Sequence, residues 1–161
     1  AYTPHTNSDV VTALLFLDDI DESNGCLTVV PGSHKGPVLS LFDGERFTGG
    51  VAADEEKQAL AKSVPCIGKA GSVCLMHTKL LHGSAANGAD KARGLYICVY
   101  TAADAVPIAR NPMPSPNEGR IVRGKEARFA RLTEGLVELP KQPKSASFFT
   151  VLGQESKQAA E

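Results

Sequence analysis

The stretch VVTALLFLDDIDESNGCLTVVPGSHKG, residues 10–36, combines apolar runs with turn signals and decides the fold class. Its first run, 10–17, is rich in Val, Leu and Phe between polar neighbours, which is typical of a strand buried on both faces. Asn24-Gly25 is a strong hairpin signal, so residues 26–30 are predicted as the second strand of a hairpin. The stretch therefore predicts antiparallel β-structure.

The remaining sequence predicts four more strands, one of them short, and one helix. Residues 54–63, DEEKQALAKS, begin with acidic residues and consist of good helix formers. The further strands are expected at 72–77, 80–85 and 93–100. Four prolines between positions 107 and 116 predict a linker or a lid. A basic stretch GRIVRGKEARFAR, a short strand at 147–152 and a polar tail complete the chain.

Composition limits the function classes. A chain of 161 residues with 42% hydrophobic content makes one domain with a core. The formal charge of -1 gives no global attraction to nucleic acid or to an anionic membrane, so a small-molecule substrate is expected. The apolar run 10–17 is too short to cross a bilayer, and no export signal is visible. The cysteines form no CxxC pair, which favours reduced core thiols in a cytoplasmic protein: Cys26, Cys66, Cys74 and Cys98.

A second stretch, HTKLLHGSAANGADKAR at 77–93, carries the candidate site. Residues two apart on a strand share a face, so His82 and Ser84 point the same way and His77 does not. A four-residue turn in the following loop would pair Ser84 with Arg93. Arg93 then needs a carboxylate or phosphate partner, and a ligand carboxylate is attractive. The same alternation places an apolar, inward face on the Arg93 side, formed by Leu95, Ile97 and Val99.

Together, LLFLDDIDESNGCLTVVPGSHKG and HGSAANGADKAR resemble the phytanoyl-CoA dioxygenase family of Fe(II)- and 2-oxoglutarate-dependent oxygenases. The resemblance covers about residues 8–101. It implies a mainly β, cupin-like jelly roll (double-stranded β-helix), with a short helix and an irregular C-terminal extension. Residues 1–106 would form the C-terminal part of the oxygenase core, and 107–161 a Pro-rich and basic extension of the same domain. By this resemblance His82 is the distal iron ligand, while Arg93 and Ser84 hold the far carboxylate of 2-oxoglutarate.

The sequence departs from the family pattern at the other iron ligands. The family uses an HxD motif before the first stretch, and no HxD occurs in these 161 residues. His5 and Asp9 are the local substitutes, but on a strand they would stand about 13 Å apart, at about 3.3 Å per residue. We expect instead a chain truncated at its N-terminus, with HxD upstream of Ala1, that is inactive alone.

The implied activity is a dioxygenase that uses Fe(II), 2-oxoglutarate and O2, hydroxylates a small organic or acyl substrate and releases succinate. The alternatives are a catalytically incomplete jelly-roll binding module and a hydrolase or isomerase with another metal. His82 could also be a core histidine and Arg93 a salt-bridge residue. The acidic cluster at 18–22 is expected to be a solvated turn, and the basic 119–131 segment a solvated face or a site for an anionic substrate or a partner subunit. A homodimer is compatible with the sequence.

Overall fold

A computed structural model describes residues 4–111 and 114–133. The described chain is mainly β, as predicted, with one α-helix and two short 3-10 helices. The helices are η1 (Glu22–Asn24), η2 (Ser33–Lys35) and α1 (Ala53–Leu60). The strands are β1 (Val10–Phe16), β2 (Leu27–Val29), β3 (Phe42–Asp43), β4 (Arg46–Phe47), β5 (Val64–Cys66), β6 (Val73–His77), β7 (His82–Ser84) and β8 (Leu95–Thr101).

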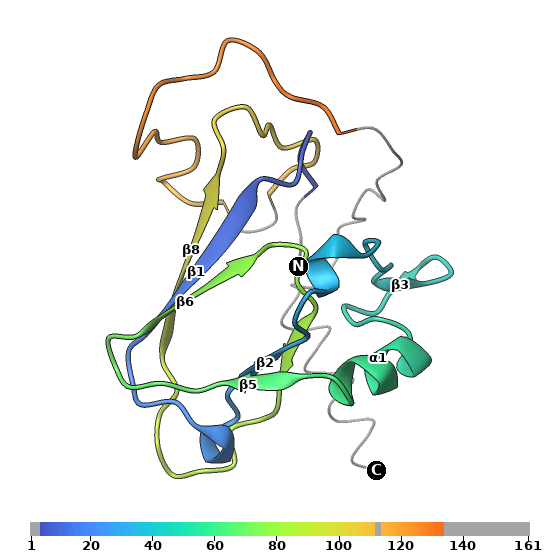
Figure 1. Ribbon diagram of the computed structural model, residues 1–161, viewed down its shortest axis with the longest axis vertical. Helices are drawn as coiled ribbons and strands as arrows, with labels where there is room; N and C mark the ends of the chain where they lie inside the picture. Colours follow the sequence, from blue (N-terminus) through green and yellow to red (C-terminus); the bar gives the residue numbers. More distant parts are fainter. Residues whose placement is uncertain (1–3, 112–113, 134–161) are drawn as a thin grey trace.

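Six of these strands form two antiparallel sheets, visible in Figure 1. The first sheet has the order β6-β1-β8 and the second the order β5-β2-β7, while β3 and β4 form a separate hairpin. Successive strands therefore alternate between the sheets: β6 joins the first, β7 the second and β8 the first again. This interleaving is the jelly-roll pattern, and the predicted fold class is confirmed.

The predicted hairpins are wrong, although the strands themselves exist. β1 and β2 lie in different sheets, and Asn24-Gly25 instead ends η1, with Gly25 in the left-handed conformation at φ 71°. β7 pairs with β2, whereas β8 pairs with β1, so Ser84 stands opposite Leu27 and not opposite Arg93. Turn signals report where the chain bends, but they do not select which distant strand pairs with a given edge.

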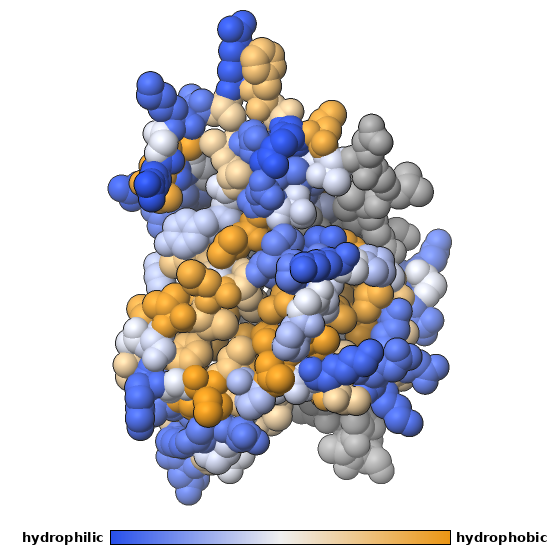
Figure 2. All heavy atoms as spheres, in the orientation of Figure 1, coloured by the Kyte–Doolittle hydropathy of each residue, from blue (hydrophilic) through white to orange (hydrophobic). Residues whose placement is uncertain are grey.

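The core lies on one face of β1. Along β1 the buried residues alternate with more exposed ones, and Val11 is 40% exposed, so the prediction of burial on both faces is wrong. The inward face predicted for β8 is also only partly buried, because Ile97 and Val99 are exposed. Figure 2 shows hydrophobic residues gathered in the middle of the surface, where β6 and β5 run. The core cluster consists of Leu14, Phe16, Ile20, Cys26 and Met76, with Leu27, Cys74, Leu80 and Leu95 packed against it.

All four cysteines are free thiols, as predicted. Cys26 is buried in the core cluster, and the other three are half-buried. Burial raises the pKa of Cys66 to about 11, and the neighbouring Cys74 adds to the shift. Cys66 is therefore a protonated thiol near neutral pH, which suits a packing role.

Beyond β8, the described chain contains no further helix or strand up to residue 133. It returns to the N-terminal segment, where Pro107 forms a β-bridge with His5, and Arg131 forms ion pairs with Asp9 and Asp104. The division of the domain at residue 107 stays a prediction, and the strand expected at 147–152 lies outside the described residues. No helix within residues 4–111 and 114–133 is long and apolar enough to cross a bilayer.

Candidate functional site

His82 lies on β7, which is at the edge of the second sheet. Its Nδ1 atom is 2.7 Å from the carbonyl oxygen of Leu80. A carbonyl can only accept, so Nδ1 donates, and the neutral ring keeps an unprotonated Nε2. The side chain is exposed, and the residues that the structure describes offer Nε2 no hydrogen-bond partner. A ring held by one nitrogen with the other nitrogen free is the usual state of a metal-binding histidine.

Ser84 follows His82 on the same strand. Residues two apart share a face of a strand, so the Ser84 hydroxyl and the His82 ring lie on the same side of β7. Both side chains are exposed, while their backbones pair with Leu27 and Val29 of β2. The predicted shared face of His82 and Ser84 is thus present.

Arg93 lies in the loop of residues 85–94 that joins β7 to β8, which we call the arginine loop. Its Nη1 atom donates to the carbonyl oxygen of Ala85 over 3.4 Å, a long and weak hydrogen bond. Arg93 makes no ion pair with any residue in the described ranges. The loop, and not the predicted strand pairing, brings the guanidinium next to the residue that follows Ser84. Most of its donors remain available to a ligand.

His77 and His34 form a separate pair. Their ring centroids are 5.2 Å apart, and His77 Nδ1 accepts a hydrogen bond from the backbone of Lys79 at 3.0 Å. Burial lowers the pKa of His77, and the nearby His34 contributes to the shift. In the loop that contains η2, which also holds His34, the Ser33 hydroxyl accepts a hydrogen bond from the backbone N–H of Leu81 at 2.8 Å. The contacts of His77 and the η2 loop are structural and support the start of β7.

The two substitutes for the HxD pair have other contacts. His5 is bridged to Pro107, and the Asp9 carboxylate accepts from Arg131 Nη2 at 2.6 Å. The described parts of the chain contain no group of three or more His, Cys, Asp or Glu side chains that could hold a metal ion. Of the predicted ligand set, the structure places His82 beside Ser84 and leaves His5 and Asp9 in other contacts. Metal binding by these residues stays a prediction.

The acidic cluster, expected as a solvated turn, makes specific contacts that sequence reasoning missed. The side chain of Asp18 accepts from the backbone N–H of Gly94 at 2.7 Å. Asp19 forms an ion pair with Lys69, and Asp21 forms one with Lys91. These lysines hold the pKa values of both aspartates below their usual range. The run of acids between two strands marks this turn in the sequence, but it does not show which donors the carboxylates contact.

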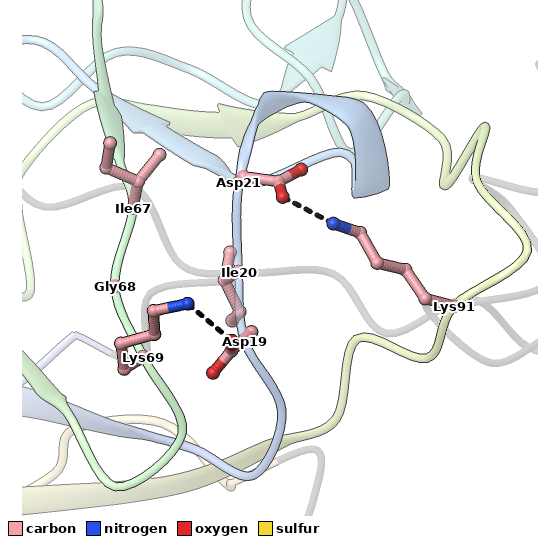
Figure 3. A pocket seen from close by; sticks show the side chains of 7 residues that line it. All are labelled: Asp19, Ile20, Asp21, Ile67, Gly68, Lys69 and Lys91. Atoms are coloured by element: carbon pink, nitrogen blue, oxygen red, sulfur yellow. Dashed lines mark hydrogen bonds and ion pairs between the residues drawn. The ribbon is translucent and has the colours of Figure 1, made fainter.

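A pocket of about 480 Å³ lies beside this turn, shown in Figure 3. Its walls contain both ion pairs, and Lys91 reaches across from the arginine loop toward Asp21. The lining residues do not include His82, Ser84 or Arg93. The pocket is therefore distinct from the site on β7.

Residues 1–95 match the family model "Phytanoyl-CoA dioxygenase (PhyH)". The chain belongs to the phytanoyl-CoA dioxygenase family. One relative, named a probable alpha-ketoglutarate-dependent hypophosphite dioxygenase from Stutzerimonas stutzeri, is 33% identical over 87% of the chain and 50% of its own length. The peroxisomal phytanoyl-CoA dioxygenase of Rattus norvegicus is 31% identical over 70% of the chain and 34% of its own length. The chain thus spans half or less of the length of these two relatives.

Solved structures share the fold. The non-heme alpha ketoglutarate dependent carbocyclase SnoK, from nogalamycin biosynthesis, aligns over 83% of the chain and 49% of its own, with 26% identity and a TM-score of 0.52. This likeness supports the assignment of the fold.

Proposed function

We propose that this member of the phytanoyl-CoA dioxygenase family forms the cosubstrate-binding part of an Fe(II)- and 2-oxoglutarate-dependent dioxygenase. The substrate would be a small organic or acyl compound, hydroxylated as 2-oxoglutarate is converted to succinate. The observation that carries the proposal is the hydrogen bond from Arg93 to the carbonyl of Ala85, the residue that follows β7, on which His82 and Ser84 share a face. The dependence on alpha-ketoglutarate named for two similar proteins supports it.

The residues fit the anchoring of 2-oxoglutarate. The molecule ends in a carboxylate, and a guanidinium free of ion pairs within the described residues can bind it with two parallel hydrogen bonds. The exposed Ser84 hydroxyl can donate a further bond from β7. Arg93 and Ser84 would then fix the direction from which the cosubstrate approaches His82.

The residues fit iron only in part. His82 offers an oriented imidazole nitrogen, which is a suitable ligand for Fe(II). The facial triad needs a second histidine and a carboxylate, and the described chain holds no such group together. Bound iron would supply the activation of O2. In this chain, the Leu80 carbonyl would keep the proton of His82 on Nδ1, and Arg93 and Ser84 would orient the cosubstrate.

One binding experiment tests the proposal. Equilibrium dialysis with radiolabelled 2-oxoglutarate up to millimolar concentrations, with Mn(II) in place of Fe(II), should show saturable binding to one site. Unlabelled 2-oxoglutarate should displace the label, and 2-oxoadipate, which is longer by one methylene, should displace it much less. Absence of saturable binding would refute the proposed function.

A catalytically incomplete binding module is the second candidate. The absence of a group of three metal-binding side chains within the described residues favours it. The two functions differ in metal dependence, because only the oxygenase uses a chelating end of the cosubstrate. Binding of 2-oxoglutarate that is equally tight with and without Mn(II) would favour the module.

A further inference from the structure

We propose that Asp18 and Asn24 are positioning residues, which hold Arg93 where it can bind the carboxylate of 2-oxoglutarate. This inference rests on the proposed function and extends it to the acidic turn, residues 18–25. The guanidinium of Arg93 has one long hydrogen bond of its own, at 3.4 Å. Its position therefore depends on how its backbone is anchored.

Gly94, the residue after Arg93, is held through both its backbone N–H and its carbonyl group. The Gly94 N–H donates to Asp18 Oδ2 at 2.7 Å, and the Gly94 carbonyl accepts from the Leu17 N–H at 3.0 Å. A charged acceptor gives a stronger hydrogen bond than a neutral one. Space is also tight, because a Cβ at Gly94 would lie 2.9 Å from Asp18 Oδ2. The end of β1 thus clamps the residue that follows Arg93.

The residue before Arg93 is held by Asn24. The Asn24 side chain is fully buried, at 0% exposure. Its Nδ2 group donates to the carbonyl oxygens of Ala92 at 3.3 Å and Asp19 at 3.0 Å, while Oδ1 accepts from the Asp21 N–H at 3.0 Å. One amide therefore joins the arginine loop to the acidic turn, and every bond it makes is to backbone.

Two further contacts press the acidic turn against the arginine loop. Gly25 has φ 71°, and a Cβ there would lie 2.5 Å from the Ala85 carbonyl oxygen, which is also the acceptor for Arg93. Lys91 forms an ion pair with Asp21, drawn as a dashed line in Figure 3. The loop is anchored at its start, near its end and on both sides of Arg93.

These anchors have a functional consequence. An arginine side chain is long and flexible, so its useful position depends on a backbone fixed close to its Cα. Bidentate recognition of a carboxylate tolerates little displacement. Loss of the Asp18 anchor should weaken the binding of 2-oxoglutarate without removing any group that touches it.

The test compares Asp18→Ala with Asp18→Asn, because the asparagine keeps an oxygen that can accept from Gly94. We expect the dissociation constant of 2-oxoglutarate, measured by equilibrium dialysis with Mn(II), to rise about tenfold in the alanine variant and to change less than threefold in the asparagine variant. Hydrogen exchange of the Gly94 amide should accelerate only in the alanine variant. Asp19→Ala is the matched control, because Asp19 bonds to Lys69 and Ala70 instead of the arginine loop; its binding should be unchanged.

The outcomes are separable. A folded Asp18→Ala protein that binds 2-oxoglutarate as tightly as the unaltered protein overturns the inference and leaves the proposed function intact. An unaltered protein that binds no 2-oxoglutarate overturns both. If Asp18→Ala does not fold, Asp18→Glu takes its place, since its carboxylate is displaced by one methylene. Equal affinities of Asp18→Glu and Asp18→Asn then overturn the inference.

Discussion

The carbonyl oxygen of Leu80 lies 2.7 Å from Nδ1 of His82 and fixes the tautomer of the candidate ligand. The contact is local, from a residue just before β7 to the first residue of the strand. It directs Nε2 away from the backbone.

The first prediction concerns the metal. In the unaltered protein, micromolar Mn(II) should broaden the amide NMR signals of residues 82–84, because Nε2 of His82 is the available donor. His82→Ala should lose this broadening. The control His77→Ala should keep it, since His77 lies on the other sheet and has structural contacts. Equal broadening in His82→Ala and the unaltered protein would contradict the assignment.

The second prediction concerns Arg93. Arg93→Ala should weaken the binding of 2-oxoglutarate by at least about tenfold, because a charge-assisted hydrogen bond contributes about 1.5–3 kcal/mol. Arg93→Lys should recover only part of the loss, since an ammonium cannot form the bidentate pair. Equilibrium dialysis measures both, with the exposed Arg123→Ala as the control. Unchanged affinity in Arg93→Ala would exclude the anchoring role.

The third prediction separates conformational strain from steric conflict at two glycines. Gly25 and Gly32 both have positive φ, at 71° and 81°, but only a Cβ at Gly25 would meet neighbouring atoms. Gly32→Ala should cost about 1–2 kcal/mol in the free energy of unfolding. Gly25→Ala should cost about 3–5 kcal/mol, since overpacking adds to the strain. Urea denaturation measures both, and equal losses would show that the acidic turn does not press on the arginine loop.

The fourth prediction is a pH dependence of stability. Because the pKa of His77 is lowered in the folded protein, the unfolded chain binds a proton more readily. The contribution to stability is therefore full above the ordinary value of 6.5 and declines as the pH falls below it. Burial is the main cause; His34 and Lys79 act in the same direction, and Asp9 opposes them. Urea denaturation between pH 5 and 8 should show this slope, and His77→Gln should reduce it; an unchanged slope would contradict the assignment.

The fifth prediction concerns the basic segment. Arg131 donates to the carboxylates of Asp9 and Asp104, and its presence lowers the pKa of Asp104. Arg131→Ala should loosen the segment, which then keeps only backbone contacts such as the hydrogen bond from Asn7 to the Arg131 carbonyl, so trypsin should cleave faster after Arg120 and Arg123. High salt should speed cleavage of the unaltered protein, because these exposed ion pairs are screened. Arg128→Ala, which leaves the ion pairs in place, is the control. If trypsin cleaves Arg131→Ala no faster than Arg128→Ala, the segment is held by other contacts.

Sequence patterns predicted the strands well and their partners poorly. Of the six strands expected, five correspond to β1, β2, β6, β7 and β8, and the sixth, at 147–152, lies outside the described residues. The helix ends at Leu60 instead of residue 63. The short strands β3, β4 and β5 were missed. β5 contains Pro65, which argues against a strand, but a sheet edge tolerates proline.

In the candidate site, too, the arrangement within one strand could be predicted, and the contacts between distant residues could not. The shared face of His82 and Ser84 follows from strand periodicity and could be predicted. The place of Arg93 depends on the acidic turn, through Asp18 and the buried Asn24. Those contacts connect residues far apart in the sequence, and no local pattern specifies them.

The two sides of β1 have a kinetic consequence. Val10 pairs with Thr101, and Val11 pairs with His77. The central strand of the first sheet can therefore form its hydrogen bonds only after two distant segments of the chain have reached it. Long loops have to close before such contacts form, and proteins dominated by them fold in milliseconds to seconds. The arginine loop is anchored at the end of β1 and continues into β8, so it can order only late. We expect the ability to capture a carboxylate ligand to appear in the slowest phase of refolding.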